Sequence, residues 1–297
     1  MTGTEAVKAL HDYYDIANPT EDDDFICTEA LGFLIEKTKD PKYMCELGWH
    51  YCAKKRFDLE IRYLEMAAEC GYLPALEELG YMWYYGQHGE QDYKKAFYYF
   101  SRGVQDKGTG SLWCRYKLAD MYRNGYAVEK DEAKAREIIE EAWEQVKEPR
   151  FFNEPFPEIA HRLAEIREAD GDREEAVRLL RQAKRFLAER IRNDPFWGYF
   201  SVMKRIVTLL YRLTPFDPQK NDLYDLFYLL ETPGTCVLRR GRQKFRIDAE
   251  ETEESPAAVR FDGRWYRNVA EFCQKAAWNG EKLTENYDEY CVGEVIR

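Results

Sequence analysis

One stretch constrains the fold of this chain more than any other: residues 118–135, with the sequence LADMYRNGYAVEKDEAKA. Leu118 and Tyr122 are four residues apart, which places them on one face of a helix. Gly125 stands where the end of a helix favours a left-handed residue, and Asp131 stands where its carboxylate can cap the next helix. The stretch therefore predicts a helix, a tight turn and a second helix.

The same pattern occurs twice earlier in the chain. One copy runs from Leu79 to Ala96, and a weaker copy begins at Leu47. The expected capping aspartates, Asp58, Asp92 and Asp131, lie 34 and then 39 residues apart. This spacing is typical of helix pairs in solenoid repeats, in which each pair covers the apolar face of the pair before it.

These residues resemble Sel1-like repeats, which are relatives of tetratricopeptide repeats. The family pattern is a leucine, a small residue, an aromatic residue, a glycine, then aspartate and lysine-alanine, and residues 118–135 match it most fully. Lys54 replaces the turn glycine in the first copy, and Gly103 replaces an alanine in the second. The resemblance covers about Pro41 to Ala142 and implies an α/α superhelix of the kind that usually serves as a protein-interaction scaffold.

The rest of the sequence predicts further helices and a small mixed domain. We expect capping helices in residues 1–40, a Sel1/TPR-like repeat array in residues 41–232 and a small α+β domain in residues 233–297. Outside the three copies, a helix pair is expected around Gly171, with single helices at 5–16, 25–37, 195–213, 221–230 and 269–278. The fold class is therefore mostly α, an α/α superhelical repeat array followed by an α+β domain.

The C-terminal domain is expected to contain two hairpins and a returning edge strand. The hairpin turns fall at Gly241 and at Asp262-Gly263, and the edge strand at Tyr290 to Ile296. At about 60 residues the domain is near the lower size limit for independent stability, so we expect it to pack on the helical array.

Charge and composition limit the classes of partner. The formal net charge is −11, which argues against general binding to nucleic acid phosphates or to anionic membranes. Because no apolar run approaches the length of a membrane span and the N-terminal residues lack a signal-peptide pattern, a cytoplasmic protein is expected. The 8 cysteines include no CxxC pair and are interpreted as small buried residues in a reducing compartment.

The sequence contains no recognisable catalytic, cofactor or metal motif. The histidines at 11, 50, 88 and 161 have no HExxH or other ligand spacing, and GxSxG, GxxxxGK[ST] and a strand-associated GxGxxG are all absent. We therefore predict a non-enzymatic protein with no cofactor and no metal. An enzyme with its site between the array and the C-terminal domain is the least favoured reading, and it requires a deep pocket with converging polar groups.

Helix phase identifies candidate partner-binding residues. If Leu47, Leu79 and Leu118 point inward, residues two, five and six positions later point away from that contact. With Tyr116 on the same face, the set is Trp49, Tyr81, Tyr84, Tyr85, Tyr116, Asp120 and Arg123. Exposed Tyr, Trp and Arg are typical of binding hot spots. The alternative is that these rings pack against a neighbouring repeat.

Two kinds of charged segment leave alternatives open. The acidic run 21–24 suits the positive end of a helix dipole, and a binding patch is the other interpretation. The basic stretch 178–192 is explained either by a solvated face paired with the acidic helix at 165–175 or by a patch for an acidic partner.

The sequence thus supports two main functional hypotheses. The first is a non-enzymatic scaffold or adaptor that binds a protein or peptide on the concave face of the array. The alternative is a nucleic-acid-associated regulator that uses the basic stretches 178–192 and 239–246. Salt dependence separates them, because phosphate binding weakens steeply as salt rises.

Overall fold

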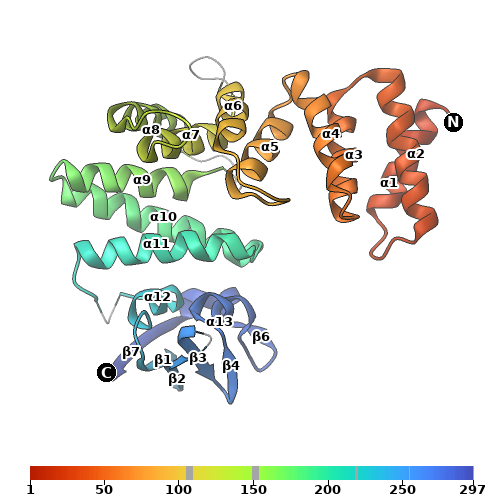
Figure 1. The fold of residues 1–297 in the computed structure, drawn as a ribbon. Helices are drawn as coiled ribbons and strands as arrows, with labels where there is room; N and C mark the ends of the chain where they lie inside the picture. Colours follow the sequence, from red (N-terminus) through yellow and green to blue (C-terminus); the bar gives the residue numbers. More distant parts are fainter. Residues whose placement is uncertain (105–109, 149–153, 218–219, 254, 297) are drawn as a thin grey trace. The chain divides into compact units, whose positions relative to one another are not determined.

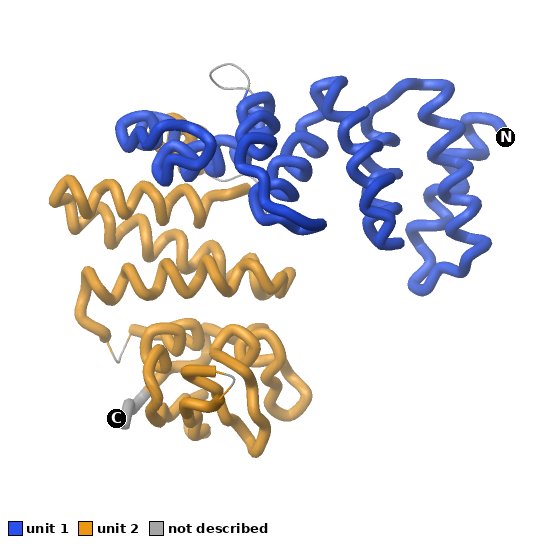
Figure 2. Tube along the Cα trace, viewed as in Figure 1, with its two compact units in different colours: residues 1–138 blue, residues 139–297 orange. Residues whose placement is uncertain are grey.

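Helices make up most of the chain, and the strands all follow residue 233 (Figure 1). The computed structural model describes residues 1–104, 110–148, 154–217, 220–253 and 255–296. The chain divides into two compact units, residues 1–138 and 139–297 (Figure 2). The predicted fold class, mostly helical repeats with a C-terminal strand-containing segment, is confirmed.

Unit 1 is a succession of short helices. They are α1 (Gly3–Tyr14), α2 (Glu21–Thr38), α3 (Pro41–Ala53), α4 (Phe57–Glu69), α5 (Leu73–Tyr85), α6 (Tyr93–Gly103), α7 (Leu112–Asn124) and α8 (Glu132–Val146), the last of which continues past the unit boundary. From α1 to α7 each helix packs against the next one in the chain, as in solenoid repeats. None of the helices in the described part of the chain has the length and apolar character needed to cross a bilayer.

Capping side chains and left-handed glycines set the helix ends that the repeats predict. Asp92 and Asp131 each accept a hydrogen bond, at 2.8–3.0 Å, from backbone N–H groups in the first turn of the following helix. Gly86 and Gly125 end α5 and α7 with φ angles of 63° and 71°. The acidic run 21–24 forms the first turn of α2, which confirms the helix-start interpretation.

The first repeat departs from the prediction. Asp58 is not a cap, because α4 begins at Phe57 and Asp58 lies inside its first turn. The left-handed residue in the turn before α4 is Lys55, with φ 58°, rather than Lys54. Because this turn has no glycine, Lys55 adopts the left-handed conformation, which costs a residue with a Cβ roughly 1–2 kcal/mol.

The three leucines that define the repeat register, Leu47, Leu79 and Leu118, are all buried, as expected. Helix contacts beside them depend on small residues. A Cβ placed on Gly80 would lie 2.4 Å from Cε1 of Phe100, whose ring packs directly on the backbone of α5. Gly103 similarly makes room for the Cys114 thiol, since a Cβ there would lie 2.3 Å from Sγ. These positions fix how closely neighbouring helices approach.

Unit 2 consists of longer helices followed by the sheet. The helices are α9 (Phe156–Ala169), α10 (Arg173–Asn193), α11 (Trp197–Leu213), α12 (Leu226–Leu229) and α13 (Val269–Lys275), with 3-10 turns η1 (Leu223–Asp225) and η2 (Leu283–Glu289). The strands are β1 (Gly234–Arg240), β2 (Gln243–Thr252), β3 (Ser255–Phe261), β4 (Arg264–Tyr266), β5 (Ala277–Trp278), β6 (Glu281–Lys282) and β7 (Tyr290–Ile296). The main sheet is antiparallel, with strand order β4-β3-β2-β1-β7.

Local signals in the C-terminal segment predicted most of its elements. Both hairpins form, and Asp262 and Gly263 adopt φ angles of 49° and 75° at the second turn. Strand β7 pairs with β1 at the sheet edge, as expected. Two predicted helices are wrong in extent: 221–230 contains only η1 and the short α12, and 269–278 ends at Lys275 because its last residues form β5. Residues 233–297 pack on α10 and α11 through η2 and α13, as expected for so small a domain.

We expect Gly80→Ala to lower the free energy of unfolding by on the order of 1–3 kcal/mol, because the new Cβ would overlap the Phe100 ring. The matched control is Gly32→Ala in α2, where a Cβ would meet nothing within 4 Å. That change should instead stabilise the protein by roughly 0.5–1 kcal/mol, since alanine loses less backbone entropy. Urea denaturation of both variants measures the difference. A neutral Gly80→Ala would show that the repeat register is wrong.

Candidate functional site

The seven residues predicted as a binding strip do not form one exposed surface. Tyr84, Tyr116 and Asp120 are buried, Trp49 and Tyr85 are exposed, and Tyr81 and Arg123 are intermediate. The expectation that all seven point away from the helix contacts is therefore corrected. For Tyr84 the reason is that α5 packs against α4, α6 and α7, so residues opposite its inward leucine are also covered.

Lys117 on α7 organises the aromatic residues of this region. Its Nζ donates a hydrogen bond to Tyr85 Oη at 2.6 Å and lies 4.5–5.3 Å from the ring centroids of four tyrosines. The side chain is buried, so the ring faces replace part of its hydration. The sequence analysis missed this residue, because a lysine beside an inward leucine is normally interpreted as a solvent-exposed position.

Tyr85 is exposed and yet held in place. Its ring stacks on Tyr81 at 6.0 Å with an interplanar angle of 15°, and meets Tyr84 edge-on at 4.9 Å. The hydrogen bond from Lys117 holds its hydroxyl. A ring that is already ordered loses little conformational entropy when a partner covers it. Tyr85 is therefore the residue of the strip with the properties of a binding anchor.

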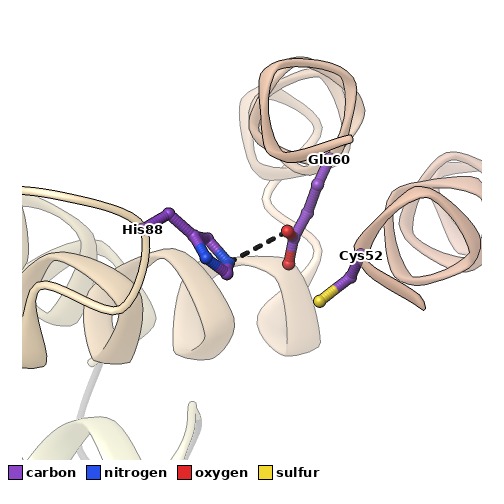
Figure 3. Close-up of side chains that lie close together, drawn as sticks. All are labelled: Cys52, Glu60 and His88. Carbon is purple, nitrogen blue, oxygen red and sulfur yellow. Dashed lines mark ion pairs between the residues drawn. The ribbon is translucent and has the colours of Figure 1, made fainter. Parts of the chain in front are cut away.

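One group among the described residues has the composition of a metal site. Cys52, Glu60 and His88 bring a thiol, a carboxylate and an imidazole within 4.8 Å of one another (Figure 3). No ligand motif covers their separations of 8 and 28 residues. The sequence analysis missed the group because only the stacking of successive helix pairs brings the turn after α5 next to α4.

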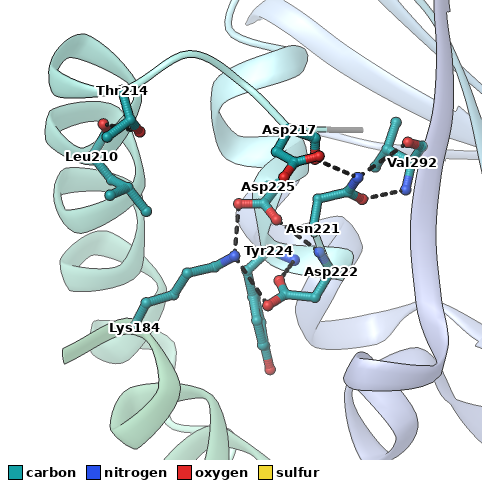
Figure 4. A network of polar contacts seen from close by, with 9 residues as sticks. All are labelled: Lys184, Leu210, Thr214, Asp217, Asn221, Asp222, Tyr224, Asp225 and Val292. Carbon is teal, nitrogen blue, oxygen red and sulfur yellow. Dashed lines mark hydrogen bonds and ion pairs between the residues drawn. The ribbon is translucent and has the colours of Figure 1, made fainter. Parts of the chain in front are cut away.

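A second cluster of ionisable groups lies in unit 2 and joins the sheet to the helices (Figure 4). Lys184 on α10 is buried, with Nζ 2.7 Å from Asp225 Oδ1 and 3.0 Å from Asp222 Oδ2. Burial lowers the pKa of this ammonium, but the two carboxylates outweigh burial and raise it. The adjacent Asn221 exchanges hydrogen bonds with the backbone of Val292 on β7. The cluster has a structural role: the buried ammonium of Lys184 pairs with two carboxylates from the chain segment that leads to the sheet.

The fold occupies only part of the basic stretches 178–192 and 239–246. Arg178, Arg181 and Arg185 are exposed and line one surface hollow, but Asp172, Glu174 and Glu175 line the same hollow, so its charge is mixed. The fold uses Lys184 and Arg190, which are buried beside carboxylates, and Arg178, Arg192, Arg240 and Arg246, which form surface ion pairs. Phosphate binding requires cations gathered on one face. The described contacts therefore lend little support to a nucleic-acid interface here.

A pocket of about 360 Å³ lies in unit 2 between α11 and the sheet-containing segment. Phe200, Phe227 and Leu230 line it, and its two ionisable residues, Lys204 and Glu231, are both exposed. Catalytic acids and bases are usually held in environments that change their pKa, such as a buried site beside another charge. No such pair is found among the residues that line the pocket, so it does not support an enzymatic reading.

Comparison with known proteins assigns the repeats. The family model for the Sel1 repeat matches residues 61–72, 73–105 and 114–145. A solved Sel1 repeat protein from Oxalobacter formigenes is 28% identical over 40% of this chain and 90% of that chain, with a TM-score of 0.35. No curated protein gives a significant match.

Two further solved structures are similar at lower identity. A protective antigen of uropathogenic Escherichia coli that displays an SLR fold is 18% identical over 61% of this chain and 41% of that chain, with a TM-score of 0.44. The C-terminal part of a TPR repeat-containing protein from Cytophaga hutchinsonii is 14% identical over 73% of this chain and 86% of that chain, with a TM-score of 0.42.

We expect Tyr85→Phe to lower the free energy of unfolding by about 1.5–3 kcal/mol, because it removes the hydroxyl that accepts a hydrogen bond from the buried Lys117 ammonium. The matched control is Tyr98→Phe on α6, whose hydroxyl accepts from Arg102 at an exposed position. That change should stay within about 0.5 kcal/mol. Equal effects in a denaturant titration would mean that the Lys117 cluster does not hold Tyr85.

Lys184→Met should destabilise the protein by about 3–5 kcal/mol, because it leaves Asp222 and Asp225 buried without their cation. Arg178→Met on the same helix is the control, since its ion pair with Glu175 is on the surface and such pairs contribute less than about 1 kcal/mol. Chemical denaturation followed by circular dichroism measures both. If Lys184→Met lowered the free energy of unfolding no more than Arg178→Met does, the cluster would not have this structural role.

Proposed function

Since the chain contains three Sel1 repeats, a repeat type that generally mediates protein–protein interaction, we propose that it is a non-enzymatic scaffold that binds a protein or peptide partner. The proposed contact surface is centred on Tyr85 of α5. Trp49 and Tyr81, from α3 and α5, and Arg123 of α7 are proposed as further contacts. The buried members of the original strip act through packing rather than through direct contact.

The observation that carries this proposal is the combination of exposure and order at Tyr85. Its relative exposure is 55%, although two ring contacts and a hydrogen bond hold it. Tyrosine offers a large apolar ring and a polar group at low entropic cost, and such residues dominate the energetics of protein interfaces. An ordered exposed ring on a repeat array is therefore a reasonable anchor for a partner.

A photo-crosslinking amino acid at position 85 tests the proposal. We expect it to capture one defined protein from cells that produce the chain, identified by mass spectrometry. The matched control places the same amino acid at position 98, because Tyr98 on α6 has a relative exposure of 54%. Equal capture at both positions, or capture only at position 98, would count against the surface around Tyr85.

The captured partner then allows a quantitative measurement. We expect Tyr85→Ala to weaken its binding by at least about tenfold, which corresponds to 1.4 kcal/mol. Tyr98→Ala should leave the affinity unchanged. Because loss of the Tyr85 hydroxyl is itself expected to destabilise the fold, thermal melts of both variants first define a temperature at which each is fully folded, and binding is measured below it.

A further inference from the structure

A thiol, a carboxylate and an imidazole from three separate elements meet inside unit 1 (Figure 3). Cys52 comes from the last turn of α3, Glu60 from the first turn of α4 and His88 from the turn between α5 and α6. Nε2 of His88 lies 3.0 Å from Oε2 of Glu60, and all three ligand atoms lie within 4.8 Å of one another. Zinc holds sulfur at about 2.3 Å and nitrogen or oxygen at about 2.0–2.2 Å, so the ligand atoms of a tetrahedral site lie roughly 3.3–3.7 Å apart. Side-chain movements of about 1 Å would bring the group to that spacing.

Glu60 is a buried carboxylate with no permanent positive charge among its close neighbours in the described part of the chain. Its side chain is 1% exposed, and the polar groups beside it are the His88 imidazole, with Nε2 3.0 Å from Oε2, and the Cys52 thiol. Its close cationic partner, His88, is charged only when protonated. Burial raises the pKa of the nearby Glu78 carboxyl, and the charge of Glu60 raises it further. The region is therefore short of positive charge, and buried charge is costly unless it is compensated.

His88 is positioned by its neighbour in the preceding repeat. Its ring stacks on Phe57 with centroids 3.8 Å apart and an interplanar angle of 14°. In Figure 3 the imidazole extends from the turn toward the Glu60 carboxylate. Because stacking already restricts the ring, little further ordering is needed for a ligand to bind to it.

The order of the three groups argues against a catalytic thiol. Glu60 lies between the imidazole and the thiol (Figure 3), and a neighbouring negative charge disfavours the thiolate that a nucleophilic cysteine requires. A bound metal ion displaces the proton of a cysteine thiol, so Cys52 can serve as a ligand in this position.

We propose that Cys52, Glu60 and His88 bind one zinc ion through Sγ, a carboxylate oxygen and Nε2. A mixed thiolate, carboxylate and imidazole set suits zinc, whereas magnesium and calcium prefer oxygen ligands alone. The three protein ligands leave one tetrahedral position for water. The ion joins the α3–α4 pair to the turn of the next pair, and it stabilises the folded chain because this site exists only when the repeats are stacked.

Titration of the metal-free, untagged full chain with zinc chloride tests the site. We expect one equivalent to bind and to raise the melting temperature, and cobalt in place of zinc to show thiolate-to-metal charge-transfer absorption. Cys52→Ser and Glu60→Gln should each weaken zinc binding at least about tenfold. Cys70→Ser, which changes an exposed cysteine outside the group, should bind as the wild type does.

Glu60→Gln also separates a metal ligand from a simple partner of His88. Without metal, we expect this variant to melt at or above the wild type, because the amide removes an uncompensated buried charge. Added zinc should raise the melting temperature of the wild type only. If Glu60 merely pairs with protonated His88, the metal-free variant melts lower and zinc leaves the wild type unchanged. That result, or a cobalt spectrum without a sulfur band, overturns the proposal.

Discussion

The close approach of successive helices at small residues is the contact on which the repeat array depends. Gly48 lies beneath Leu64, and the equivalent Gly80 lies beneath Phe100, so the second helix of each pair packs on the backbone of the first. The third copy has the buried Ala119 at this position, the smallest side chain that can replace glycine. Because each pair can bury its apolar face only against its neighbours, a loss of close packing in one pair is transmitted to the next.

Three buried charged side chains, Lys184, Lys117 and Glu60, differ in how far neighbouring groups compensate their charge. Lys184 has two carboxylates within 3.0 Å, and Lys117 has tyrosine ring faces and a hydroxyl. Among the described residues, Glu60 has beside it the His88 imidazole, which is charged only when protonated, and the neutral Cys52 thiol. Since burial penalises every uncompensated charge, the difference between these sites is itself informative. The neighbours of Lys184 and Lys117 account for the burial of these two charges. The neighbours of Glu60 do not, which is a reason to propose a bound cation beside it.

The C-terminal segment shows how a small sheet is stabilised by helices in the same unit. Its main sheet ends at β7, and an isolated domain of about 60 residues buries too little apolar surface to be robust. Asn221 binds the backbone of β7, and the following Asp222 reaches Lys184 on α10. These polar contacts fix the attachment geometry, while η2 and α13 supply the packing against α10 and α11.

The sequence by itself determined the helix and hairpin boundaries that depend on local interactions. Asp92 caps its helix, Gly86 ends one, and Asp262-Gly263 forms a two-residue turn, because each acts on backbone groups within a few residues. Asp58 is not a cap because α4 begins one residue before it, directly after a turn in which Lys55 is left-handed. Within the sheet segment, short elements such as β5 depended on pairing that local propensity does not record.

Only the tertiary structure decided which side chains are accessible and which distant ones meet. Helix phase identifies one buried face, but α5 contacts three other helices, so Tyr84 is covered while Tyr85 stays exposed. The meeting of Cys52 with His88 likewise requires helices from successive repeats to stack. Whether a side chain is buried, and which possible ligands lie near it, depend on contacts between residues far apart in the chain. Sequence periodicity describes only the helix or strand to which a residue belongs.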